Sequence, residues 1–140
     1  MKIVQHFKQV PKLFKNLEKK NIAAVTGSRM MIKKSALKGK MPLYKFLGNL
    51  VLTNFFNLVF KSKFTDCHTG LWSYNIKKLK KINLNKIDSG YNFDSQLRIK
   101  FVINKLKIDE IPIETHYRDE HSSFHFKYSF NFFKELFFYR

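Results

Sequence analysis

The stretch TDCHTGLWSYN, from Thr65 to Asn75, gathers several residue types that could do chemistry. It holds the only cysteine of the chain, Cys67, next to His68, with Asp66 before the pair and Thr69-Gly70 after it. A thiol and an imidazole could form a nucleophile and its base. Adjacent side chains on an extended chain point in opposite directions, however, so the two are poorly placed to act on each other. A small, half-buried thiol is the favoured interpretation of Cys67.

Asp66 leaves two interpretations open. A carboxylate at a glycine-containing turn could act as a base or orient a sugar hydroxyl. It could equally cap the local backbone in an Asx-type turn, and the local pattern alone favours this second role.

Two further segments could bind an anion. Thr26 to Arg29, TGSR, places a guanidinium after an apolar run, where α/β proteins bind ligands and arginine matches phosphate oxygens. Arg118, followed by Ser122-Ser123, is either a phosphate contact or part of a solvated turn. A metal site is not expected from Cys67 and His68 with the later histidines, because they lack a recognised ligand spacing. Those histidines are His116, His121 and His125.

The elements that must position these residues alternate between helices and short strands. Hydrophobic spacing predicts a helix from Phe7 to Leu17, a buried strand at 21–29, a basic stretch without periodicity from Met30 to Met41, and a helix from Pro42 to about Phe60. After the loop described above, it predicts a short basic helix from about Ile76, a turn at Ser89-Gly90, and a helix at 91–106 whose inward residues are Phe93, Leu97, Phe101 and Ile103–Leu106. An edge strand at 107–117 and a Phe-rich amphipathic helix at about 124–139 complete the order. This order predicts one α/β domain over residues 1–140, with a thin parallel sheet.

Charge is the strongest global signal. The formal net charge is +17, and residues 1–63 carry 14 Lys and Arg against the single acid Glu18. Such a field favours an anionic partner, whether nucleic acid, anionic lipid or a phosphorylated substrate, although a lysine-biased surface without a dedicated site is the plain alternative. The uncharged run from Phe46 to Phe60 is short for a membrane span and contains three Asn, so we expect a buried or interfacial helix. One cysteine fits a reducing cytoplasm.

Read together, five segments resemble a known family. They are GSR, KGKMPLYKFLGNLVLTNFFN, DCHTGLWSYN, GYNFDSQLRIK and IDEIPIETHYRDEHSS, and in this order they resemble the second half of family 2 glycosyltransferases, in particular the dolichyl-phosphate mannosyltransferase-like group. The resemblance implies a GT-A fold, a nucleotide-sugar donor and a polyprenyl-phosphate acceptor. It also implies a protein in the cytoplasm, peripheral at the inner face of the membrane, where a basic surface and the Phe-rich helix would meet anionic lipid.

The resemblance assigns roles to individual residues. Asp66 matches the candidate base, with His68 beside it, and Thr69 and Gly70 match the same substrate-side loop. Arg29 matches an arginine near the donor phosphates. Two residues of the loop after the second strand, Arg118 and Ser123, match a family pattern of substrate contacts.

The resemblance also shows where this sequence departs from the family. The divalent metal, Mg²⁺ or Mn²⁺, is held in the family by a D-x-D motif, whose positions fall on Met1 and Ile3, while Gln5 matches a metal-contacting glutamine. Hard cations need oxygen ligands, so the metal would be weakly held. Trp72 stands where the family has an arginine.

We therefore expect the C-terminal part of a transferase domain, weakly active or inactive alone. A separate chain that supplies the N-terminal half is one way to complete it. The alternative is a non-catalytic basic module that binds anionic membrane or nucleic acid. We do not expect nucleic acid as the main partner, because the aromatic residues cluster in helical patterns rather than on strands.

Overall fold

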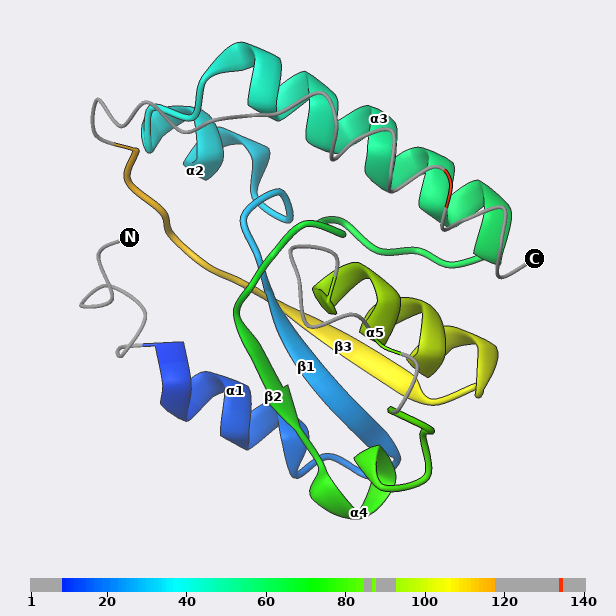
Figure 1. Ribbon diagram of the computed structural model, residues 1–140. Helices are drawn as coiled ribbons and strands as arrows, with labels where there is room; N and C mark the ends of the chain where they lie inside the picture. The colour runs from blue at the N-terminus through cyan, green and yellow to red at the C-terminus, as the bar shows by residue number, and fades with distance from the viewer. Residues whose placement is uncertain (1–8, 85–86, 88–92, 118–133, 135–140) are drawn as a thin grey trace.

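A three-stranded mixed sheet organises the domain (Figure 1). The computed structural model describes residues 9–84, 87, 93–117 and 134. Strand β1 (Ile22–Ser28) lies in the middle, parallel to β3 (Lys107–Pro112) and antiparallel to β2 (Trp72–Tyr74). All residues of β1 are buried, as the short apolar run predicts for a central strand.

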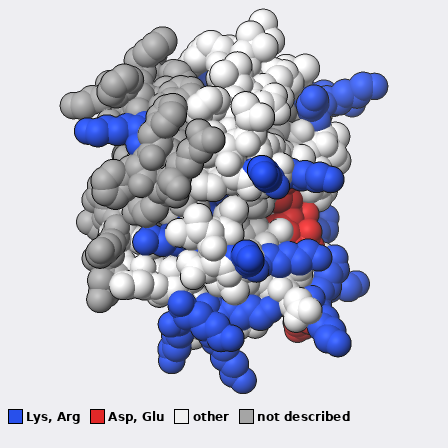
Figure 2. All heavy atoms as spheres, turned by 90° about the vertical axis from the view of Figure 1, so that its right-hand side faces the viewer, with Lys and Arg blue, Asp and Glu red and all other residues white. Residues whose placement is uncertain are grey.

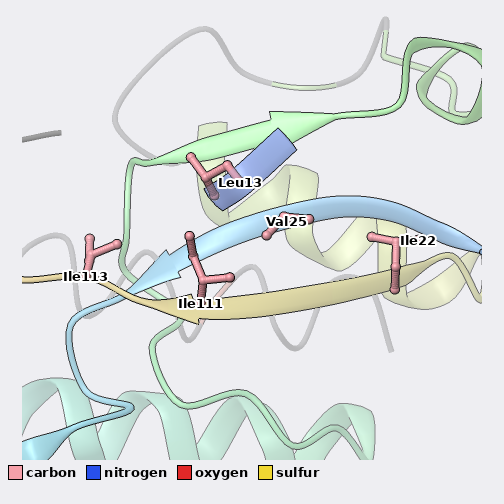
Figure 3. Packing of buried hydrophobic residues seen from close by; sticks show 5 residues of the cluster. All are labelled: Leu13, Ile22, Val25, Ile111 and Ile113. Carbon is pink, nitrogen blue, oxygen red and sulfur yellow. The ribbon is translucent and has the colours of Figure 1, made fainter. Parts of the chain in front are cut away.

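Helices pack on both faces of the sheet. Helix α1 (Val10–Leu17) places Leu13 against a cluster formed with β1 and the β3 region, shown in Figure 3, whose other members are Ile22, Val25, Ile111 and Ile113. Helix α5 (Phe93–Ile103) packs Leu97 and Phe101 against Ala23 and Ala24. Because the neighbours Ala24 and Val25 point to opposite faces of the strand, the two helices cover opposite faces.

The remaining helices lie at the two ends of the sheet. Helices α2 (Lys33–Lys38) and α3 (Leu43–Phe60) lie beyond the end at which β1 finishes, and the short α4 (Ile76–Leu79) lies at the other end (Figure 1). The segment from Lys61 to Leu71 returns from α3 to β2 and passes the end of β1. This brings the opening stretch beside the TGSR turn.

Helix α3 buries polar residues on its inner side and exposes apolar residues on its outer side. Its inward residues include two polar ones, Asn49 and Thr53, beside the apolar Leu52 and Phe56. Its outward stripe is apolar at helical spacing and consists of Leu43, Leu47, Val51 and Leu58, which are 58 to 76% exposed. By length and composition alone α3 is the one helix among the described residues that could cross a membrane, and 22% of it is buried.

Most predicted elements are confirmed, and several details are wrong. The sheet is mixed rather than parallel, because Trp72–Tyr74, expected within a loop, pairs with β1 as an antiparallel strand. A short helix, α2, forms in the stretch expected to lack structure, where Ala36 packs against Met30 and Met41.

The inward face of α5 is also shorter than predicted. Phe93 and Ile103 are 41% and 45% exposed, because they are the first and last residues of the helix and extend beyond its contact with the sheet. The predicted start of the first helix, the turn at Ser89-Gly90 and the Phe-rich helix at 124–139 lie outside the described residues, apart from Lys134, which is helical.

Candidate functional site

A buried ion pair joins the TGSR turn to the DCHTG loop. Arg29 follows the last residue of β1, and its Nε donates to Asp66 Oδ2 at 2.7 Å while Nη2 donates to Oδ1 at 2.9 Å. This is the bidentate geometry in which guanidinium and carboxylate groups pair most strongly. Two segments 37 residues apart in the sequence are thereby fixed at the end of the central strand.

Asp66 accepts five hydrogen bonds. Besides the two from the Arg29 side chain, they come from the Arg29 amide, the Asn49 side chain and the His68 amide, at 2.8 to 3.1 Å. Burial alone would raise the pKa of Asp66. The charge of Arg29 and these donors outweigh burial and hold the pKa well below its usual range. The carboxylate is fully buried and ionised, and the bond from His68 is the Asx-type contact that the sequence left open.

Glu110 of β3 holds the beginning of the same loop. Its carboxylate accepts from the Thr65 amide at 2.7 Å, from the Thr65 hydroxyl at 2.8 Å and from the Asp66 amide at 3.3 Å. Ser28 Oγ lies 2.6 Å from Thr65 Oγ1. Residues near the ends of the neighbouring strands β1 and β3 therefore set the positions of Thr65 and Asp66.

Cys67 and His68 differ in their surroundings. Cys67 is buried in an apolar cluster between α3 and α5, its amide donates to Thr53 Oγ1, and burial raises the pKa of its thiol to about 12. A thiol in this state is a poor nucleophile. His68 is half-buried, and burial together with the charges of Arg29 and Arg98 lowers its pKa to about 4 although Asp66 acts in the opposite direction.

The turn at Thr69-Gly70 forms the exposed side of the site. Thr69 is buried, its carbonyl accepts from Trp72 Nε1 at 2.9 Å, and Gly70 is exposed. The side chain of Asp94 lies opposite, with Oδ2 3.6 Å from the place that a Cβ on Gly70 would occupy. Burial raises the pKa of Asp94, and the charge of Arg98 partly offsets the effect.

Arg29 has little capacity left for a ligand. Its side chain also donates to the Tyr117 hydroxyl at 3.2 Å and to the His68 carbonyl at 2.8 Å, so it makes four hydrogen bonds within the domain. A guanidinium has five N–H donors, which leaves one for an anion.

The structure brings together five of the predicted site residues, and their roles stay predictions. Arg29, Asp66, His68, Thr69 and Gly70 lie at one end of the sheet. The other three predicted residues, Gln5, Arg118 and Ser123, lie outside the described residues. Within the described part of the chain, no group of three His, Cys, Asp or Glu side chains is placed to hold a metal ion, so we derive no step through a metal.

Sequence reasoning missed four residues that shape the site, Asn49, Asp94, Arg98 and Glu110. Two of them carry a signal that could have been used. Asn49 is a polar residue inside a long uncharged run, and Glu110 stands next to Ile111 in a strand. A polar residue within an apolar element is informative because its burial requires a partner.

Comparison with known proteins gives two relatives. An uncharacterized protein of Methanocaldococcus jannaschii is 35% identical over 115 residues, which are 81% of this chain and 46% of that protein. The low-salt glycan biosynthesis hexosyltransferase Agl6 of Haloferax volcanii is 27% identical over 114 residues, which are 81% of this chain and 27% of that protein.

The chain therefore spans less than half the length of either relative, and it resembles a glycosyltransferase over most of its own length. No protein-family model matches the sequence, and no solved structure matches it.

Proposed function

We propose that this chain is the C-terminal part of a family 2 glycosyltransferase domain of the GT-A type, which moves a sugar from a nucleotide-sugar donor to a polyprenyl phosphate or a similar acceptor. One observation supports this most directly. The buried Arg29–Asp66 pair joins two of the five segments on which the family resemblance rests, and it does so at the end of a central β-strand. In open α/β sheets, ligands bind at this end.

The side-chain geometry suggests a division of work among the carboxylates. Asp66 is saturated with donors and fully ionised, which suits a group that positions Arg29 and the backbone of His68. Asp94 has a raised pKa and faces exposed Gly70, which suits a group that binds a sugar hydroxyl. We assign substrate contact to His68, Gly70 and Asp94, and positioning to Asp66.

A phosphate acceptor needs little help from a base. Its oxygen is already a nucleophile at neutral pH, so the new bond forms between this oxygen and the anomeric carbon while the bond from that carbon to the donor phosphate breaks. The remaining N–H of Arg29 can contact a phosphate oxygen of either the donor or the acceptor. Two further parts of the proposal rest on the resemblance. One is Mg²⁺ or Mn²⁺ at the donor diphosphate, with Gln5 as one ligand. The other is a separate chain that completes the donor site.

The surface formed by α2 and α3 supports a membrane-bound acceptor. Besides the apolar stripe of α3, the segment around α2 exposes Met31, Ile32 and Leu37. From residue 19 to residue 65 the sequence has no acidic residue, and the same segment carries the exposed lysines Lys33, Lys34, Lys38 and Lys40.

Figure 2 shows one side of the molecule, on which Lys and Arg side chains gather mainly at the lower end, opposite the end at which α3 lies in Figure 1. An exposed apolar stripe on α3, together with the exposed lysines of the α2 segment, fits the interface of an anionic bilayer, where a lipid phosphate lies. We propose that α2 and α3 seat the chain on the inner face of the cytoplasmic membrane.

Sugar transfer to vesicles that contain polyprenyl phosphate tests the proposal. The purified chain is incubated with radiolabelled nucleotide sugars and divalent metal, and binding to the same vesicles is measured in parallel. We expect tighter binding to polyprenyl phosphate than to phosphatidylglycerol vesicles of equal charge, with little or no transfer. Where transfer is detected, Asp94→Asn should lower it by about tenfold or more.

The alternative is a non-catalytic basic module that binds anionic membrane or nucleic acid. Equal binding to all vesicles of equal charge, without any transfer, would favour it and contradict the proposed acceptor. Vigorous metal-dependent transfer by the chain alone would support the function and overturn the expectation of weak activity.

A further inference from the structure

Arg98 of α5 is the largest fully buried side chain among the described residues, with 0% of its surface exposed. Its Nε, Nη1 and Nη2 atoms have no hydrogen-bond acceptor within the described part of the chain. A buried charge without hydrogen bonds is costly, and an apolar residue of similar volume is often neutral or stabilising in its place. The arginine therefore needs a reason other than stability.

Two aromatic rings enclose the guanidinium. Arg98 Cζ lies 4.6 Å from the centre of the Trp72 ring and 4.7 Å from the centre of the Phe64 ring. A desolvated cation over aromatic faces is attracted to both, and the flat guanidinium stacks on them as an ammonium does not. The guanidinium carbon therefore lies within 5 Å of both ring centres.

Both rings adjoin the ends of the site loop, since Phe64 directly precedes Thr65 and Trp72 is the last residue of the loop. Trp72 donates to the Thr69 carbonyl and so fixes the end of the loop. Glu110 binds Thr65 and the Asp66 amide and so fixes its beginning. Burial raises the pKa of Glu110, and the hydrogen bonds from Thr65 and then the charge of Arg98 act against this rise. Through its contacts with Phe64 and Trp72, Arg98 acts on both ends of the loop.

We propose that Arg98 is a positioning residue for the loop from Thr65 to Trp72. Its guanidinium lies over the ring of Phe64, the residue before Thr65, and over the ring of Trp72, and so holds both ends of the loop in place. What the loop does to a substrate rests on the proposed function, but its positioning is measurable without any substrate. Failure of sugar transfer would therefore leave this inference standing.

Amide hydrogen exchange of Arg98→Met is the test. We expect the amides of Thr65, Asp66 and Leu71 to exchange at least about tenfold faster than in the wild type, with β1 and α5 unchanged. The thermal midpoint should equal or exceed that of the wild type. Trp72 is the only tryptophan of the chain, so its fluorescence emission should change as well. Lys107→Met, which removes one exposed cation from β3, is the control and should behave as the wild type.

Arg98→Lys separates stacking from charge. The lysine keeps the charge but does not stack on the rings as a guanidinium does, so exchange should accelerate at Leu71 and at Thr65. Wild-type exchange across the loop in Arg98→Met, or equal acceleration in every element, would overturn the proposal. If Arg98→Met does not fold, Arg98→Lys decides, and wild-type exchange at Leu71 in that variant overturns it.

Discussion

At the scale of single residues, the type of a side chain does not decide its reactivity in this site; its surroundings do. Cys67, Asp66 and His68 are the residue types most often used in catalysis, yet burial makes the thiol inert and the Arg29 partner keeps Asp66 ionised. Asp94 has no such partner in an ion pair at short range among the described residues, and its pKa is raised. The state of each group follows from its neighbours, which a sequence does not place.

His68 gives stability a specific pH dependence. Its pKa is about 4 in the folded chain and 6.5 as the ordinary value, so the unfolded chain binds the proton first as the pH falls. Unfolding by urea should therefore become easier between pH 6.5 and 4, and the His68 contribution lost over this window is about 3 kcal/mol.

The variant His68→Gln isolates this contribution. The raised pKa values of Asp94 and Glu110 act in the opposite direction, because the folded chain holds their protons more tightly, but both variant and wild type share them. The free energy of unfolding should depend less steeply on pH in His68→Gln. Identical slopes would show that His68 binds its proton equally in the folded and the unfolded chain, which contradicts a lowered pKa.

At the scale of elements, the segment after β3 depends on a close approach of two backbones. Gly39 ends α2, the Tyr117 amide donates to its carbonyl at 2.7 Å, and a Cβ on Gly39 would collide with the Thr115 carbonyl oxygen. The φ of Gly39 is −71°, so alanine is excluded by this collision rather than by backbone conformation. Tyr117 in turn accepts a hydrogen bond from Arg29.

Gly39→Ala should therefore push residues 115–117 away from α2 and lower the free energy of unfolding by about 1 to 3 kcal/mol in urea titrations. Gly70→Ala is the matched control, because the nearest atom to its new Cβ would be 3.6 Å away. A loss of stability in Gly70→Ala as large as in Gly39→Ala would contradict the argument.

Elements also show how far the sequence predicts this fold. The buried strand before Arg29, the helix after Pro42 and the edge strand ending near Pro112 follow from periodicity and turn residues, which are local properties. Strand β2 has only three residues, and its antiparallel pairing depends on where the loop returns to β1.

The candidate site shows the same limit. The motifs predicted Arg29 after a buried strand, and the resemblance assigned Asp66 to a substrate-side loop. The burial of Arg98 and the hydrogen bonds of Glu110 to the loop arise from contacts between segments far apart in the chain. Such contacts have no local sequence pattern, so periodicity and motif spacing do not predict them.

At the scale of the whole molecule, two exposed surfaces lie at opposite ends. The exposed stripe of α3 lies at the end of the sheet that carries the site, while the lysines of α4 lie at the other end (Figure 1). A bilayer that binds the α3 end would place a lipid phosphate near the site. A partner that binds the α4 end would lie far from the site.

Two double variants of equal charge decide between these arrangements. Leu47→Asp with Val51→Asp changes two side chains of α3 that are 58% and 63% exposed, so folding should be unaffected. Phe14→Asp with Ile76→Asp changes two side chains of α1 and α4 that are 57% and 59% exposed.

In flotation with vesicles of phosphatidylglycerol and phosphatidylcholine, the α3 variant should lose binding by about tenfold or more, because it loses apolar area and gains repulsion from the anionic surface. The α1–α4 variant adds the same charge away from the proposed interface and should bind nearly as the wild type does. Binding should also weaken with added salt, since lysines contribute to it. Equal loss in the two double variants would show that net charge alone attracts the chain to the membrane, and that α3 has no preferred place at the bilayer.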